Sequence, residues 1–334
     1  MLSKSVIKEM VMRFSEYYKR VLCSSCFILM VFTFNIGCQG TAVKETSTTG
    51  SSDSLKKQVK EDILVGTLNV LVDEAGLALT EEHREVFLSS YYNAKVNLIA
   101  KPEVMAVQDL LSEKAGVAIL ARKLSDEEEA FFTKRGIVPR VFPVWSDAIV
   151  LINSTNSADT SVTVENLFKI MEGNSAEGKK LVFHNINSSH FRLLKDLGGI
   201  DKVASNFVEG RNDILEVLKA IEADANAIGI LGYNEYLNFS SSLSNKNNIR
   251  ILSLGNTFGE HADGLYYKPS QSTLATQKYP LRHIFYMMNY QPNMGLGVGF
   301  SAFVTGDRGQ RIVLKSGLLP ATMPGRELII RDKI

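Results

Sequence analysis

Short apolar runs alternate with segments of helical periodicity along most of the chain. The runs are aliphatic and β-branched, which is typical of buried strands. In the first part of the chain they lie at 64–72, 95–100, 116–121, 141–144 and 148–153. Helices are expected to begin between them at Thr80, at Pro102 and at Ser125, which forms a capping box with Glu128. Strands that alternate with helices in this order predict an α/β domain with a largely parallel sheet.

A second unit follows the same alternation. Its predicted helices cover 163–171, 188–197 and 212–223, and its predicted strands cover 180–184 and 227–231. A segment at 249–254 is expected to return the chain to the first unit. The remainder is predicted to hold a strand at 284–288, a glycine-rich turn and a helix over 299–315.

The first 38 residues have the composition of an export signal. Five basic residues precede an apolar stretch at 21–34, and Gly37 stands directly before Cys38. A basic region, a short apolar region and a small residue at the cleavage point describe a secretory signal peptide. A cysteine after the small residue is what a bacterial lipoprotein signal requires. We therefore predict a signal peptide over 1–37, lipidation of Cys38 and a flexible tether over 38–62. An ordinary signal peptide or an uncleaved anchor is the alternative.

Composition narrows the classes of function. The 334 residues are 45% hydrophobic, which is enough for a sizeable core. Their net charge of +1 becomes −2 once residues 1–37 are removed, and this balance argues against a general nucleic-acid binder. All three cysteines lie within the first 38 residues. The body of the protein is therefore expected to have no disulfide, no cysteine-based metal site and no catalytic thiol.

Common catalytic motifs are missing from the sequence. GxxxxGK[ST], HExxH and GxSxG do not occur, and the glycines at 295, 297 and 299 lack the GxGxxG spacing, so a turn or helix start is favoured there. His184 and His190 flank one loop, but no acidic partner lies nearby in sequence. We expect a protein that is not an enzyme and has no cofactor or metal. A hydrolase that uses either histidine beside Ser188 is the alternative.

Strand-to-helix junctions rich in polar residues are the candidate site. Asn185, Asn187, Ser188 and Ser189 lie where a predicted strand ends and a helix begins. The first N–H groups of a helix lack intrahelical partners, so such a junction can bind an anion; capping by Asn187 or Ser188 is the alternative. Arg122 follows another predicted strand, at the sheet edge where open α/β folds bind ligands. Its guanidinium suits phosphate or carboxylate, and a surface salt bridge is the alternative.

Two further junctions carry carboxylates. Asp73 and Glu74 end the first predicted strand, and Asp147 precedes another. A carboxylate opposes an anion in charge, but a buried acceptor can hold the proton of monohydrogen or dihydrogen phosphate. It would thereby reject sulfate, which has no proton at neutral pH. Turn or cap chemistry is the alternative for Asp73 and Asp147.

Six segments of the chain together resemble one family. They lie at 116–125 (GVAILARKLS), 146–154 (SDAIVLINS), 183–193 (FHNINSSHFRL), 226–235 (NAIGILGYNE), 279–288 (YPLRHIFYMM) and 299–325 (GFSAFVTGDRGQRIVLKSGLLPATMPG). In this order they are similar to the phosphate-binding, PstS-like branch of the periplasmic solute-binding proteins of ABC transporters. More narrowly, they resemble the lipoprotein members common in Bacteroidetes. The resemblance spans residues 64–331.

The resemblance implies a type II periplasmic binding-protein fold, with two α/β lobes joined by a hinge and a ligand cleft between them. Lobe one would comprise 63–151 and 252–334, and lobe two 152–251. The implied anion contacts are Arg122 and the loop from Asn185 to Ser189, with Asp147, Asp73 and Glu74 as weaker candidates. The implied ligand is inorganic phosphate or a similar oxyanion, and the implied protein partners are ABC permease subunits. We expect an exported, periplasm-facing or cell-envelope monomer that binds no nucleic acid and meets the membrane through its lipid.

Two junctions differ from the family pattern. Phosphate binders of this family have a small Gly-Ser-Ser-Thr-like turn after the first strand, where this chain has the residues at 73–76 (DEAG). The second-lobe loop, at 187–190, reads NSSH in place of a Gly-Ser-Gly-Thr-like sequence. Two acidic residues in the first turn are expected to weaken the binding of an anion or to select an anion that carries a proton. The same fold used as an envelope sensor or assembly protein, with a different or no small-molecule ligand, therefore stays open.

Overall fold

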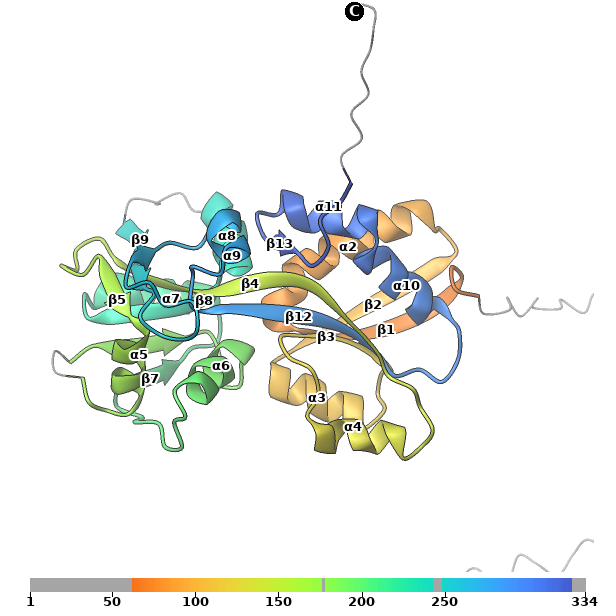
Figure 1. Cartoon of the computed structure of the whole chain (residues 1–334), viewed down its shortest axis with the longest axis horizontal. Helices are drawn as coiled ribbons and strands as arrows, with labels where there is room; N and C mark the ends of the chain where they lie inside the picture. Colours follow the sequence, from red (N-terminus) through yellow and green to blue (C-terminus); the bar gives the residue numbers. More distant parts are fainter. Residues whose placement is uncertain (1–61, 176–177, 243–247, 326–334) are drawn as a thin grey trace, which may run out of the picture. The chain divides into compact units, whose positions relative to one another are not determined.

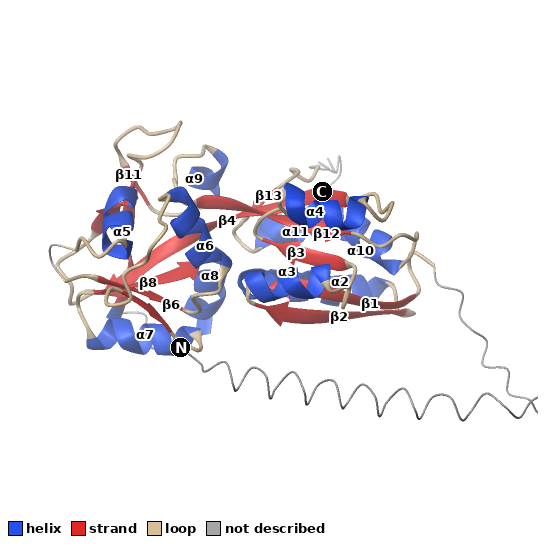
Figure 2. Ribbon diagram, turned by 90° about the horizontal axis from the view of Figure 1, so that it is seen from below, coloured by secondary structure: helices blue, strands red, loops and turns tan. Residues whose placement is uncertain are grey.

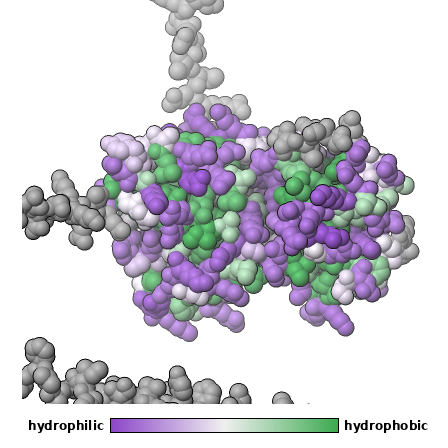
Figure 3. All heavy atoms as spheres, turned by 180° about the vertical axis from the view of Figure 1, so that it is seen from behind, coloured by the Kyte–Doolittle hydropathy of each residue, from purple (hydrophilic) through white to green (hydrophobic). Residues whose placement is uncertain are grey.

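The computed structural model describes residues 62–175, 178–242 and 248–325. The predicted signal peptide, Cys38 and nearly all of the predicted tether lie outside the described residues. Within those three stretches, no helix is both long and apolar enough to cross a membrane. The apolar side chains of the described residues gather in four core clusters, and hydrophilic residues cover much of the face shown in Figure 3.

Three parallel strands form the centre of lobe one. They are β1 (Gly66–Asp73), β2 (Ala94–Lys101) and β3 (Val117–Leu120), with β1 between the other two. The helices of this lobe are α2 (Leu77–Ser90), α3 (Glu103–Leu111), α4 (Asp126–Thr133), α10 (Leu296–Thr305) and α11 (Asp307–Lys315). They cover both faces of the strands (Figure 2), so that Val70 and Val72 pack into one core and Leu71 into another. Burial on both faces explains the continuous apolar run in the sequence.

Lobe two has the same layered arrangement. Its parallel strands are β6 (Lys180–Phe183), β7 (Val208–Gly210) and β8 (Ala227–Gly232). Its helices are α5 (Val164–Met171), α6 (Ser189–Leu197), α7 (Ile214–Ala223), α8 (Tyr233–Ser242) and the short α9 (Gln271–Ala275). A small separate sheet is formed by β5 (Ser161–Thr163), β10 (Ser253–Gly255) and β11 (Tyr266–Tyr267).

Two long strands connect the lobes (Figure 1). β4 (Arg140–Ser154) and β12 (Arg282–Asn289) pair antiparallel with each other, β12 also pairs with β3, and β4 also pairs with β8. The short β9 (Ile249–Ile251) and β13 (Leu319–Pro320) pair with β4 as well. The strands therefore follow the order β2-β1-β3-β12-β4-β8-β6-β7 in one mixed sheet. The predicted largely parallel sheet was wrong in this respect, because two parallel parts are joined by antiparallel strands.

Two predicted boundaries also need correction. The strands predicted at 141–144 and 148–153 are one strand, β4, and Asp147 lies inside it rather than before a strand. Pairing with Ile284 and His283 of β12 carries Ser146 and Asp147 through the polar interruption. The single helix predicted at 299–315 is two helices, because Gly306 is extended (φ −80°, ψ 174°) and ends α10 before α11 begins. The other predicted strands and helices lie within a few residues of their expected positions, whereas β5, β7, β11, β13, α8 and α9 were not predicted. The segment at 249–254, expected to return the chain to the first unit, packs in lobe two instead.

The glycine-rich segment begins a helix, as its spacing indicated. Gly295 is the N-cap of α10. A Cβ atom at Gly297 would lie 2.0 Å from Oε1 of Gln291, and one at Gly299 would lie 1.7 Å from the carbonyl oxygen of Ile63. These glycines therefore allow other parts of the chain to pack directly on the first turns of α10.

The lobe boundaries remain a prediction, to which packing adds one observation. Leu252, Leu254, Leu274, Tyr279 and Leu281 pack in the same core cluster as the helices of lobe two. A division by packing would therefore fall near the start of β12 rather than at residue 252.

Candidate ligand site between the lobes

Carboxyl ends of strands from both lobes meet at one buried polar cluster. Asp73, the last residue of β1, is 1% exposed. Its carboxyl group interacts with Glu103 of lobe one and with Ser189 and Glu235 of lobe two. Two of the residues singled out in the sequence, Asp73 and Ser189, are thus brought together across the lobe junction.

Asp73 is held in its neutral form near neutral pH. Burial, together with the negative charge of Glu103, raises the pKa of Asp73 to about 8. Its Oδ1 accepts a hydrogen bond from the backbone N–H of Ala75 at 3.3 Å, which is the turn chemistry considered for this residue. Its buried Oδ2 has no hydrogen-bond partner among the described residues. A protonated Asp73 can therefore donate a hydrogen bond to a further group.

Asp147 lies at the centre of β4 and is fully buried. Its Oδ1 accepts from the backbone N–H groups of Ala148 (2.7 Å) and of Asn234 (3.2 Å) in the first turn of α8. Burial raises the pKa of Asp147 to about 7, although these two hydrogen bonds oppose the shift. The Oδ2 atom is buried without a hydrogen-bond partner in the described part of the chain. Asp147 thus accepts a hydrogen bond from the first turn of α8 through Oδ1, and its Oδ2 remains available to a ligand.

Two histidines flank one glutamate that the sequence had not placed there, and a third histidine lies beside one of them. Glu235 Oε1 lies 3.8 Å from His184 Nδ1, and Oε2 lies 3.8 Å from His190 Nδ1. The backbone N–H of Gly232 donates to Oε2 at 2.7 Å. The ring of His283, from β12, lies 5.7 Å from that of His190. Across the described stretches, no group of three or more His, Cys, Asp or Glu side chains is arranged to hold a metal ion.

The surroundings shift the pKa values of the three histidines in different directions. Interaction with Glu235 raises the pKa of His184, whereas burial lowers the pKa of His190 and lowers that of His283 strongly. Burial works to raise the pKa of Glu235, but His184, His190 and the Gly232 N–H outweigh it and hold the pKa below its usual value. Burial raises the pKa of Glu74, against the attraction of His184. The surroundings therefore favour charge on Glu235 and His184 and disfavour it on His190 and His283.

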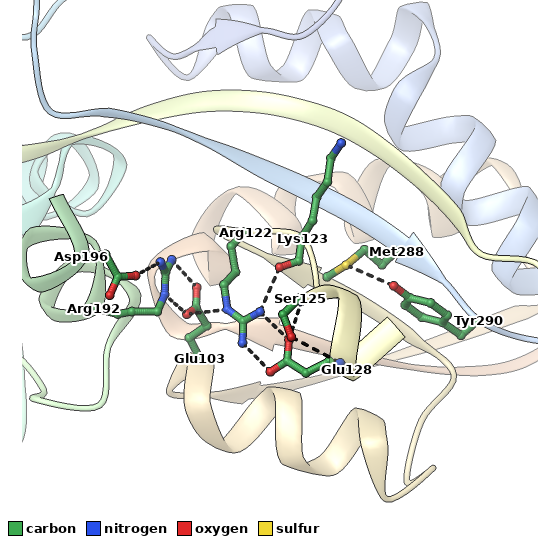
Figure 4. Close-up of polar contacts among 9 residues, drawn as sticks. All are labelled: Glu103, Arg122, Lys123, Ser125, Glu128, Arg192, Asp196, Met288 and Tyr290. Atoms are coloured by element: carbon green, nitrogen blue, oxygen red, sulfur yellow. Dashed lines mark hydrogen bonds and ion pairs between the residues drawn. The ribbon is translucent and has the colours of Figure 1, made fainter. Parts of the chain in front are cut away.

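Arg122 is fixed by a carboxylate of its own lobe (Figure 4). Its Nη1 and Nη2 donate to Glu128 at 2.6 and 2.8 Å, and Nη1 also donates to the carbonyl of Lys123 at 2.9 Å. Glu128 in turn completes the predicted capping box of α4 with Ser125. The remaining Nε is buried without a hydrogen bond and lies 3.4 Å from Glu103 Oε1. The salt-bridge alternative considered for Arg122 is thus present, and it leaves the Nε–H group directed at the lobe junction.

The loop before α6 divides into structural and free groups. Asn185 Oδ1 accepts from the backbone N–H of Asn187 at 2.8 Å, and Ser188 caps α6 by accepting from Phe191 N–H at 3.3 Å. The side chain of Asn187 is exposed. Ser189 is 1% exposed. Its Oγ faces the Asp73 carboxyl closely enough to lower the pKa of Asp73, but no well-aligned hydrogen bond joins them within the described residues. Of this loop, Ser189 is the side chain best placed to meet a ligand.

Sequence reasoning missed four residues that complete the cluster. They are Glu103 on α3, Arg192 on α6, Glu235 on α8 and His283 on β12. Arg192, Glu235 and His283 all lie within the segments that carried the family resemblance, and Glu103 directly follows the helix-opening proline. Glu103 and Glu235 could have been found in the sequence by their positions, because each lies at the start of a helix that follows a strand.

The chain belongs to the PBP superfamily. A family model described as a PBP superfamily domain matches residues 44–308. The fold is a mixed α/β, type II periplasmic-binding-protein-like fold, as the sequence predicted.

Individual relatives are phosphate-binding proteins. Phosphate-binding protein PstS of Borreliella burgdorferi is 26% identical over 245 residues, which cover 68% of this chain and 80% of that protein. A structure of a phosphate ABC transporter substrate-binding protein from Clostridium perfringens, with bound phosphate, has a TM-score of 0.62 and 14% identity, over 77% of this chain and 100% of that one. An ABC-type phosphate transport receptor from Vibrio cholerae has a TM-score of 0.59 and 15% identity, over 76% of this chain and 100% of that one. The chain is thus a distant homologue of phosphate ABC transporter substrate-binding proteins.

Proposed function

We propose that this protein captures phosphate, or a closely related oxyanion, between its two lobes for an ABC importer. The observation that carries the proposal is a set of buried polar atoms from both lobes without hydrogen-bond partners in the described structure. They are Arg122 Nε, Asp73 Oδ2, Asp147 Oδ2, Ser189 Oγ, Asn234 Nδ2 and His190 Nε2. Buried polar groups are normally paired, so such a group of atoms is the feature expected of a site for a polar ligand.

The chemistry of these atoms suits a protonated oxyanion. Arg122 Nε and Asn234 Nδ2 are donors, Ser189 Oγ can donate, and Asp73 donates while it is protonated. When its proton is lost, the same carboxylate accepts the proton of monohydrogen or dihydrogen phosphate, which sulfate does not offer. Micromolar binding corresponds to about −8 kcal/mol, and a few charge-assisted hydrogen bonds of about 1.5–3 kcal/mol each supply that after the cost of lobe closure.

The proposal includes export and a lipid anchor. The amino-terminal sequence up to Cys38 supports both, in the manner of the lipoprotein members common in Bacteroidetes. The anchored protein would face the periplasm or the cell envelope as a monomer and would meet permease subunits there. No catalytic step is part of this function, in keeping with a superfamily of binding proteins.

One observation favours a second candidate function. The arginines Arg122 and Arg192 are both paired with carboxylates of the protein itself. A sensor or assembly protein that keeps the fold but binds a different ligand, or none, would retain this pairing.

Deletion of the gene is expected to lower the uptake of labelled phosphate by cells under phosphate limitation. The wild-type gene should restore uptake, because capture precedes transport, and an Arg311→Ala variant should restore it equally, because Arg311 is paired with Asp307 on the surface of α11. Unchanged uptake after deletion, in a strain without another phosphate-binding protein, would favour the second candidate function.

A Cys38→Ala variant should shift from the membrane fraction to the soluble fraction.

A further inference from the structure

A single carboxylate joins the two lobes at the candidate site. Glu103 is the first residue of α3 and is 1% exposed. Across the lobe junction, Arg192 Nε donates to Glu103 Oε1, and Arg192 Nη2 donates to Oε2 at 3.1 Å. Within lobe one, Arg122 Nε lies 3.4 Å from the same Oε1 (Figure 4). Glu103 is thus held by one arginine from each lobe.

This setting is that of a bound anion. A two-pronged arginine contact, a second guanidinium and the amino-terminal end of a helix each stabilise negative charge. All three surround Glu103, since it opens α3 after Pro102. Each arginine also keeps a carboxylate of its own lobe, because Glu128 binds Arg122 and Asp196 binds Arg192 at 2.9 Å. Those two contacts hold the arginines in place, whereas the contact of Arg192 with Glu103 crosses the lobe junction.

We propose that Glu103, held in lobe one beside Arg122, is an internal anion that clasps the lobes through Arg192, and that an incoming oxyanion displaces it from both arginines. The clasp follows from the contacts alone, while the displacement rests on the proposed function. Glu103 would then determine affinity and selectivity: a ligand has to bind the arginines better than a preplaced carboxylate does. A residue that merely supported the arginines would have the opposite effect on ligand binding when it is replaced.

The clasp can be tested without any ligand. A soluble form beginning at Ser54 has no native cysteine, so spin labels can be placed at Met105→Cys on α3 and Asp201→Cys after α6, which are both exposed. Pulsed dipolar spectroscopy on protein freed of ligand by unfolding and refolding should give a longer and broader label distance in Glu103→Gln than in the wild type. Arg192→Gln should give the same change. Glu113→Gln is the matched control, because it removes a surface carboxylate of lobe one that is paired with Arg135 and touches neither arginine of the clasp, and its distance should equal that of the wild type. An unchanged distance in Glu103→Gln and Arg192→Gln, with circular dichroism showing folded proteins, would overturn the clasp.

The displacement is tested by phosphate titration of the same proteins. Glu103→Gln is expected to bind phosphate about tenfold more tightly than the wild type, because the competing charge is gone. Glu113→Gln, which removes a carboxylate paired with Arg135 on the surface of lobe one, supplies the control for net charge. Weaker binding in Glu103→Gln would overturn displacement and make Glu103 a support for the arginines. Absence of phosphate binding in the wild type and in Glu103→Gln would overturn both displacement and the proposed function, while the label distances would still decide the clasp.

Discussion

Replacing Arg122 with alanine is expected to weaken phosphate binding by at least about thirtyfold. Its two Nη atoms are fixed by Glu128 at 2.6 and 2.8 Å. Its buried Nε, which lies 3.4 Å from Glu103 Oε1, is the donor that an incoming oxyanion engages in place of Glu103. Loss of a desolvated, charged hydrogen-bond donor costs about 2–5 kcal/mol of binding free energy, and about 1.4 kcal/mol corresponds to a factor of ten. Calorimetric titration of wild-type and variant protein measures the difference.

The surface pair Asp307–Arg311 provides the control for this variant. Arg311 pairs with Asp307 on the surface of α11, and 52% of its side chain is accessible. Arg311→Ala therefore removes the same charge at a position away from the site. Its affinity should equal that of the wild type. Equal affinities of Arg122→Ala and wild type, in folded protein that binds phosphate, would exclude Arg122 from the site.

Replacing Asp73 with asparagine is expected to make the protein progressively more stable than the wild type as pH rises. The pKa of Asp73 is about 8 in the fold, against 3.8 for an unperturbed aspartate. Between these values the folded protein holds a proton that the unfolded chain has released, so the stabilising contribution is complete below about pH 4 and is lost as pH rises through 8. The gain of Asp73→Asn over wild type should therefore grow between pH 5 and pH 8, by up to about 1.4 kcal/mol per pH unit.

Urea unfolding at pH 5, 6.5 and 8 measures this dependence. The asparagine Oδ1 can still accept from Ala75 N–H, as the aspartate Oδ1 does, so the change is confined largely to ionisation. Asp307→Asn removes an aspartate whose side chain is 52% exposed and controls for the loss of one surface acid. A difference between Asp73→Asn and wild type that stays constant with pH would show that Asp73 is already ionised in the fold.

Local patterns predicted most of the elements but not how the strands pair. The apolar runs of β1 and β3, and the cap residues Ser125 and Ser188, carry their own structural signal and were placed correctly. The unbroken strand β4 was missed because its polar residues at 146–147 are sustained by pairing with β12, more than a hundred residues later. The antiparallel connection between the two parallel parts depends on the same long-range pairing.

The candidate site was predictable where it follows from strand ends. Asp73, Arg122 and Ser189 were found because each stands at the edge of a sheet where ligands bind. Glu103 and Arg192 are 89 positions apart, and their contact exists only because the lobes meet. The sequence likewise showed no acidic partner for His184 and His190, because Glu235 arrives from the following strand–helix junction. The roles of all these residues in ligand binding remain predictions.

Calorimetric titration of the soluble form beginning at Ser54 tests the central claim most directly. The protein is first freed of ligand by unfolding and refolding and is then titrated with phosphate and with sulfate at pH 6 and pH 8. We predict micromolar or tighter phosphate binding, and rejection of sulfate at pH 8, where Asp147, with a pKa of about 7, has lost its proton and requires a ligand that brings one. No heat from either anion, in protein shown to be folded, would contradict phosphate capture and would favour the sensor or assembly function.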